Sequence, residues 1–84
     1  MAEEITVTVR LFASYRDAAG RDRVELRVPS ATPVGALWGR LPDAVRALGL
    51  PTAARYALND TWTLPGAPLH DGDVVALVLP VSGG

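Results

Sequence analysis

The chain has 84 residues, a net charge of −1 and no cysteine. This length fits one small domain, and the near-neutral charge gives no electrostatic reason to expect nucleic acid as a partner. The missing cysteines exclude disulfides, thiolate metal sites and cysteine nucleophiles. No apolar run approaches the roughly 20 residues that span a bilayer, and the acidic start is unlike a signal peptide, so we expect a soluble cytoplasmic protein that binds no membrane.

The first quarter of the chain alternates apolar and polar residues. The odd-numbered positions from Ile5 to Leu11 are all apolar, which predicts a strand. Ser14 and Asp17 have capping-box spacing and predict a helical turn over 15–19, ended by a left-handed Gly20. A second alternating run over 24–28 predicts another strand, whose charged outer face suits a sheet edge.

The middle of the chain has one amphipathic stripe. Thr32 and Pro33 predict a helix start, and the apolar spacing over 34–41 predicts the main helix of the fold. Pro42 interrupts that helix, and the helical path should resume for about one turn before Gly49.

The last third of the chain predicts three strands, over 55–58, 61–64 and 74–79, with a turn at Asn59–Asp60. The last of these runs is apolar at every position from Val74 to Leu79, which indicates a central strand buried on both faces. The Asp71–Gly72–Asp73 turn leads into it.

These elements predict an α+β protein of the β-grasp (ubiquitin-like) type. Two long apolar strands in a small sheet should be neighbours, and a helical crossover between the first and the last makes them parallel. The expected architecture is a mixed sheet of four to five strands with one main helix on one face, formed by residues 1–80. Residues 81–84 should be a flexible diglycine tail.

The tail is the candidate working part of the chain. Pro80 removes a backbone donor and should end the last strand, so that the next four residues reach about 13 Å, enough to enter another protein's active site. Gly83 and Gly84 have no side chain to block a narrow channel, although a frayed end that happens to be glycine is the alternative interpretation.

A tail of this kind needs a docking surface beside it. Ordering four residues costs about 4–8 kcal/mol, which the contacts of the tail alone would not offset. By strand parity Phe12 points away from the core and lies at the same end of the sheet as Leu79, so the two should form an exposed apolar patch, unless a loop covers Phe12. The candidate partner-binding residues are Phe12, Leu79, Pro80, Val81 and Ser82.

The side chains offer no convincing catalytic group. His70 stands alone in a turn, and Asp71 and Asp73 flank a turn glycine, so metal binding is not expected. Both tryptophans, Trp38 and Trp62, are expected in the core or half-buried. The remaining reactive group is the terminal carboxylate, which a separate enzyme could convert to an acyl-adenylate and then to a thiocarboxylate or an isopeptide.

Several segments together resemble the small subunit of molybdopterin synthase. They are Leu11-Phe12-Ala13 with Arg16 and Ala19-Gly20, the Asn59 turn, residues 68–76, and Pro80-Val81-Ser82-Gly83-Gly84. The chain departs from that pattern at Leu79, where a proline is common, and at Asp17, where glutamate is usual.

This resemblance implies a sulfur carrier that is not an enzyme on its own. Gly84 would be adenylated by an adenylyltransferase akin to ubiquitin-activating enzymes, which uses ATP, and a sulfur donor protein would convert it to a thiocarboxylate. Gly83 would give clearance as the tail enters the large subunit of a heterotetramer, where the catalytic pocket lies and cyclic pyranopterin monophosphate accepts the sulfur. The chain would bind no cofactor or metal itself. A carrier for another thiolation pathway (thiamine, tRNA or an amino acid) and a protein modifier or interaction module are the alternatives.

Overall fold

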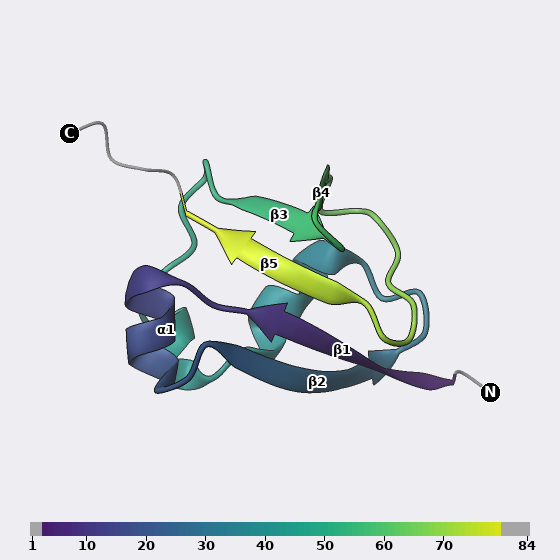
Figure 1. Ribbon diagram of the computed structural model, residues 1–84, viewed down its shortest axis with the longest axis horizontal. Helices are drawn as coiled ribbons and strands as arrows, with labels where there is room; N and C mark the ends of the chain where they lie inside the picture. The colour runs from purple at the N-terminus through teal and green to yellow at the C-terminus, as the bar shows by residue number, and fades with distance from the viewer. Residues whose placement is uncertain (1–2, 80–84) are drawn as a thin grey trace.

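The computed structural model describes residues 3–79, which form one mixed sheet of five strands in the order β2-β1-β5-β3-β4 (Figure 1). The strands are β1 (Glu4–Arg10), β2 (Arg23–Pro29), β3 (Arg55–Leu58), β4 (Thr61–Thr63) and β5 (Val74–Val78). β1 pairs antiparallel with β2 and parallel with β5, while β3 pairs antiparallel with β5 and β4. The central place of β5, the edge place of β2 and the β-grasp fold are as predicted.

The helical layer differs from the single main helix that we expected. It consists of α1 (Ala13–Ala19), a 3₁₀ helix η1 (Val34–Arg40) and a short α2 (Asp43–Arg46). Figure 1 shows α1 at the end of the sheet where β1 and β5 end, and the other two helices behind the sheet. Hydrogen bonds at the start of η1 explain why it is a 3₁₀ helix. The backbone N–H of Val34 donates to the Ala67 carbonyl at 2.9 Å, and that of Gly35 donates to the Pro65 carbonyl at 2.8 Å. A loop of the chain thus fixes the helix start, and two glycines and Pro42 weaken any longer α-helix.

Both predicted N-caps are wrong, whereas the predicted left-handed Gly20 is confirmed. α1 begins at Ala13 and has Phe12 in the N-cap position, with no side-chain cap from Ser14. At η1 the N-cap position is Pro33, because the Thr32 hydroxyl instead donates to the Pro29 carbonyl at 2.6 Å. Gly20 ends α1 with φ 74°.

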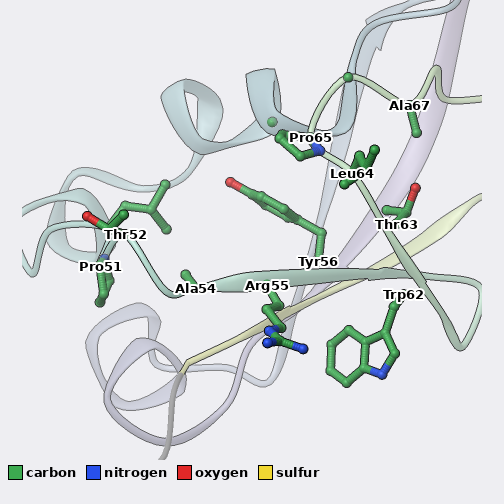
Figure 2. Close-up of a pocket in the computed structure, with 13 residues that line it drawn as sticks. Pro51, Thr52, Ala54, Arg55, Tyr56, Trp62, Thr63, Leu64, Pro65 and Ala67 are labelled. Atoms are coloured by element: carbon green, nitrogen blue, oxygen red, sulfur yellow. The ribbon is translucent and has the colours of Figure 1, made fainter.

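The turn between β3 and β4 is locked to the start of β5. Asn59 and Asp60 have positive φ values of 50° and 69°, a left-handed pair that suits a two-residue hairpin. The Asn59 backbone N–H donates to the Val74 carbonyl at 2.8 Å, and its side-chain oxygen accepts from the Val74 N–H at 2.9 Å. Successive side chains of β3 point to opposite faces of the sheet, and Figure 2 shows Tyr56 on one side and Arg55 on the other.

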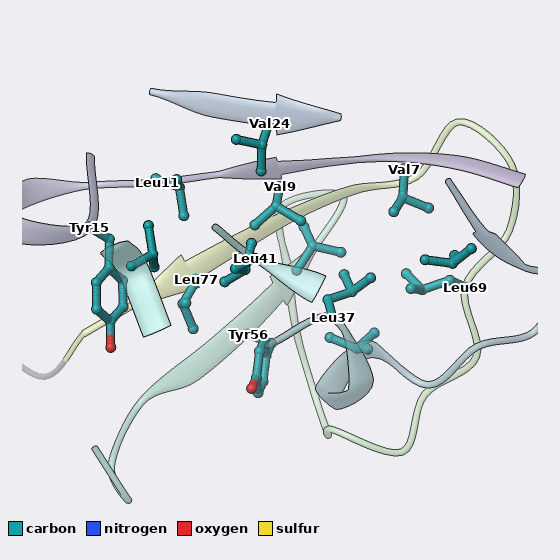
Figure 3. Packing of buried hydrophobic residues seen from close by; sticks show 14 of the residues in the cluster. Val7, Val9, Leu11, Tyr15, Val24, Leu37, Leu41, Tyr56, Leu69 and Leu77 are labelled. Atoms are coloured by element: carbon teal, nitrogen blue, oxygen red, sulfur yellow. The ribbon is translucent and has the colours of Figure 1, made fainter. Parts of the chain in front are cut away.

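The core lies between the sheet and the helices, and Figure 3 shows its packing. Its most deeply buried side chains come from every layer of the fold: Val7, Val9, Leu11, Tyr15, Val28, Val34, Leu37, Val45, Leu69, Val75 and Leu77. Tyr15 anchors α1 to this core, since its ring lies 5.7 Å from that of Trp38 and its hydroxyl donates to the Gly49 carbonyl at 2.6 Å. The helical layer covers one face of the sheet, and the opposite face remains open.

Candidate partner-binding surface

On the open face of the sheet, small alanine side chains lie between larger side chains. The strand register places Arg10, Ala76, Ala57 and Trp62 in one row across β1, β5, β3 and β4. The two alanines form the floor of this row, and Val74 and Val78 continue it along β5. We call the surface made of Arg10, Phe12, Arg55, Ala57, Trp62, Val74, Ala76 and Val78 the open-face patch.

Three large apolar side chains of this patch are exposed, which is uncommon for their residue types. Phe12 is 40% exposed, Trp62 is 60% exposed and Val74 is 37% exposed. Phe12 is therefore not covered by a loop, and it contacts the Arg10 guanidinium, whose central carbon lies 5.3 Å from the ring centroid. An apolar cluster of this kind on one face indicates a contact surface for another molecule.

The exposure of Trp62 contradicts the expectation of a core or half-buried side chain. β4 is a three-residue edge strand, and Trp62 pairs with Ala57, whose side chain points to the open face. Strand parity could have revealed this, because Tyr56 faces the core and its neighbour Ala57 must face outward. Trp38 is half-buried against the core, as predicted.

The patch continues to the point where β5 leads toward the tail. Leu79 is half-buried and packs against the core cluster, and together with Ala53, Arg55 and Val78 it lines a small hollow of about 260 Å³. The other candidate site residues, Pro80, Val81, Ser82, Gly83 and Gly84, lie outside the described residues. Phe12 and Leu79 lie at the same end of the parallel strands β1 and β5, as predicted, but the expected exposure of Leu79 is wrong because its side chain packs against the core.

A larger groove of about 1280 Å³ runs along the β3–β4 hairpin, and its lining combines residues of the helical side with Arg55 and Trp62 of the open face. It is lined by Gly35, Leu50, Pro51, Thr52, Ala54, Arg55, Tyr56, Trp62, Thr63, Leu64, Pro65, Gly66 and Ala67. Figure 2 shows the Tyr56 side chain on the same side of β3 as Pro65, and Trp62 on the opposite side. Burial raises the pKa of Tyr56, so its phenol stays protonated at neutral pH and offers no base.

The polar residues near the sheet have structural contacts. The Asp73 carboxylate accepts from the His70 backbone N–H at 2.8 Å, and Asp71 accepts from the Thr6 N–H at 2.8 Å. The turn interpretation of these residues is therefore confirmed, and His70 is exposed. Over residues 3–79 no group of three or more His, Cys, Asp or Glu side chains could hold a metal ion. None of the helices in that range has the length and apolarity to cross a membrane.

The mixed five-stranded sheet with helices on one face is a ubiquitin-like β-grasp fold. The sequence profile of the ThiS family matches residues 9–84. The chain thus belongs to the ThiS family and is a ubiquitin-like sulfur carrier. A direct comparison with curated protein sequences finds no match.

Solved structures agree with this assignment. SAMP1 from Haloferax volcanii is 28% identical, with a TM-score of 0.79 over 94% of this chain and 99% of that chain. A putative molybdopterin converting factor subunit 1 from Pyrococcus furiosus is 26% identical, with a TM-score of 0.77 over 92% and 99%. A complex of subunits 1 and 2 of the molybdopterin-converting factor from Helicobacter pylori contains a chain that is 27% identical, with a TM-score of 0.61 over 95% and 100%.

Proposed function

We propose that this chain is the sulfur-carrier small subunit of molybdopterin synthase. The observation that supports it most directly is the combination of the family match over residues 9–84 with similarity to two molybdopterin converting factor structures. The segments that resemble the synthase subunit include Phe12 on the open-face patch and the turn around Asn59 that is locked to β5.

The proposed reaction takes place at the carboxyl group of Gly84. A carboxylate oxygen attacks the α-phosphorus of ATP in the activating enzyme, pyrophosphate leaves, and an acyl-adenylate forms. The terminal sulfur of a donor persulfide then attacks the acyl carbon and displaces AMP, which forms an acyl disulfide with the donor. A second thiol cleaves this S–S bond by exchange and releases the thiocarboxylate. The large subunit would transfer this sulfur to cyclic pyranopterin monophosphate, and Gly83 would leave room for the tail in its catalytic pocket.

The open-face patch would hold the large subunit while the tail reacts. The Helicobacter pylori structure is a complex of subunits 1 and 2, which supports a partner of this kind for the present chain. Phe12, Leu79, Pro80, Val81 and Ser82 would lie at that contact, and the expected assembly is a heterotetramer with a dimer of large subunits. Docking through the body would offset the entropy lost when the tail is ordered.

Intact mass spectrometry tests the first stage. The chain is incubated with its activating enzyme, ATP and a sulfur donor, and its mass should rise by the difference between sulfur and oxygen. Removal of Gly84 should abolish the increase, whereas the surface variant Arg40→Glu, altered on η1, should retain it. A full-length chain that stays at its original mass would contradict the proposal.

The second stage separates this function from other thiolation pathways. The thiocarboxylated chain is mixed with the large subunit and cyclic pyranopterin monophosphate, and the appearance of molybdopterin is followed. A carrier for thiamine or tRNA thiolation would form the thiocarboxylate but give no molybdopterin in this mixture.

Similarity to SAMP1, a small archaeal modifier protein, favours protein modification as a second candidate function. All eight basic residues of the chain are arginine, so no lysine side chain is present to accept an isopeptide bond. As a modifier it would therefore attach to other proteins as single units, without chains linked through its own lysines. Mass mapping of conjugates from cells that express a tagged chain tests this: lysine adducts on other proteins would support the second candidate.

A further inference from the structure

We propose that the open-face patch selects a partner protein that bears two carboxylates, one opposite Arg10 and one opposite Arg55, on either side of apolar side chains that sit on the alanine floor. This inference rests on the proposed function only in that the large subunit is the partner to be tested. It assigns a specificity role to two arginines that take no part in the sulfur chemistry.

The arginines of the open face fall into two kinds. On the edge strand β2, Arg23 lies 3.6 Å from the carboxylate of Asp22 and Arg27 lies 3.3 Å from that of Glu4. Arg10 and Arg55 border the apolar floor, and neither has a carboxylate within ion-pair distance among residues 3–79. On the open face, the arginines of the edge strand are therefore paired with carboxylates, whereas the two beside the floor are open to an external anion.

The geometry limits what that anion can be. Arg10 pairs with Ala76, and Arg55 pairs with Val78, so the two arginines lie on opposite sides of β5 and two residues apart along it. Standard strand spacings then separate their Cα atoms by about 12 Å. The Arg10 guanidinium lies over the Phe12 ring, and Arg55 lines the hollow beside Val78 and Leu79, so each charged group has its own place on the patch. Two acidic residues on one protein surface fit this arrangement. The apolar floor between the arginines also requires an apolar contact, which a protein surface supplies.

The surroundings of each arginine favour selective pairing. Arg10 lies over the Phe12 ring at 5.3 Å, which restricts its side chain before any partner arrives. Arg55 lines the hollow with Val78 and Leu79, so a partner that fills this hollow removes water from the guanidinium. A partner without a carboxylate there would bury an unpaired charge, which strongly disfavours binding. The same arrangement that attracts an acidic surface therefore excludes others.

Binding to the large subunit of the same organism tests the inference. Calorimetry or surface plasmon resonance compares the wild-type chain with Arg10→Glu and Arg55→Glu, at low and at moderate salt. We expect each reversal to weaken binding at least tenfold and to reduce its dependence on salt, because an attractive pair becomes a repulsive one. Arg40→Glu makes the same charge change on η1, behind the sheet, and should bind as the wild type does.

Two further measurements keep the outcomes distinct. Circular dichroism establishes that each variant is folded, and Arg10→Gln and Arg55→Gln replace any variant that is not. Lysine substitution of the acidic residues on the large subunit should identify one position that restores binding of Arg55→Glu. Equal affinity of the wild type, the patch variants and Arg40→Glu would overturn this inference and leave the proposed function standing. Failure of the wild type to bind, together with failure to form the thiocarboxylate, would instead overturn the proposed function.

Discussion

Neighbouring residues of β5 have opposite surroundings, although all of them are apolar. Val75 and Leu77 are 1% and 2% exposed and belong to the core, whereas Ala76 and Val78 face the open side of the sheet. Both sets have the same hydrophobic sequence signal, because a strand that is apolar on both faces shows no alternation. The comparison shows that an uninterrupted apolar strand need not be buried on both faces by its own chain, and the proposed partner would cover the second face of β5.

The largest expected difference between the two faces is in stability. Leu77→Ala should lower the free energy of unfolding by about 3 kcal/mol, because it removes buried atoms and leaves a cavity in the core. Val78→Ala, its neighbour on the open face, should cost about 1 kcal/mol or less, since Val78 is only half-buried. Urea titration followed by circular dichroism measures both. Equal losses would show that β5 does not separate a core face from a contact face.

The next largest effect should appear in binding and not in folding. Trp62→Ala removes a side chain that is 60% exposed, so the unfolding midpoint should change little. Affinity for the large subunit should fall by about 2 kcal/mol, which is close to thirtyfold, if Trp62 is an anchor of the contact.

Leu64→Ala is the matched control for the tryptophan. Leu64 is 78% exposed and lines the groove along the hairpin, outside the open-face patch. Its replacement should leave the affinity unchanged. If Leu64→Ala weakened binding as much as Trp62→Ala, the groove and not the patch would be the contact surface.

Much of the fold could be predicted from local sequence patterns. Alternation marked β1 and β2, and the uninterrupted apolar run identified β5 as the central strand. The crossover argument then gave the parallel pairing of β1 with β5. The helical layer was less predictable, because η1 owes its 3₁₀ form to hydrogen bonds with residues 65–67, which lie far along the chain.

The candidate surface was predicted in part. Phe12 was identified by parity, and its exposure is now established. Trp62 was missed because large aromatic side chains are usually at least half-buried, although strand parity together with its pairing with Ala57 places it on the outer face. The two kinds of arginine could not be distinguished at all, because ion pairs such as Arg27 with Glu4 depend on strand register. The residues of the tail remain predictions, since they lie outside the described part of the chain.

A smaller effect on folding stability should come from the helical side of the sheet at high pH. Burial, followed by the neighbouring Tyr56, raises the pKa of Tyr15 above its ordinary value of 10.0. The folded state therefore keeps this phenol protonated while the unfolded state ionises, so stability should be constant below about pH 10 and fall as pH rises above it. Tyr15→Phe should make that fall less steep. It should also cost about 1 kcal/mol at neutral pH, because the Gly49 carbonyl loses its donor.

Thermal melts between pH 7 and 11 measure this dependence, and Tyr56→Phe is the control. Burial also raises the pKa of Tyr56, but its hydroxyl donates no hydrogen bond within residues 3–79. Its replacement should reduce the alkaline fall with a smaller cost at neutral pH. A steeper fall in either variant would contradict the assigned direction of the pKa shifts.

The smallest expected change in stability and binding comes from substituting a paired arginine on the edge strand β2. Arg27 and Glu4 are well exposed and 3.3 Å apart, so Arg27→Ala should change the unfolding free energy by about 0.5 kcal/mol or less. Affinity for the large subunit should stay within twofold of the wild type, because this arginine is already neutralised and lies on the edge strand, two strands from β5. Arg55→Ala, tested beside it, should weaken binding several-fold. Equal losses for the two variants would mean that the partner covers the whole open face and that the contact does not end at the apolar floor.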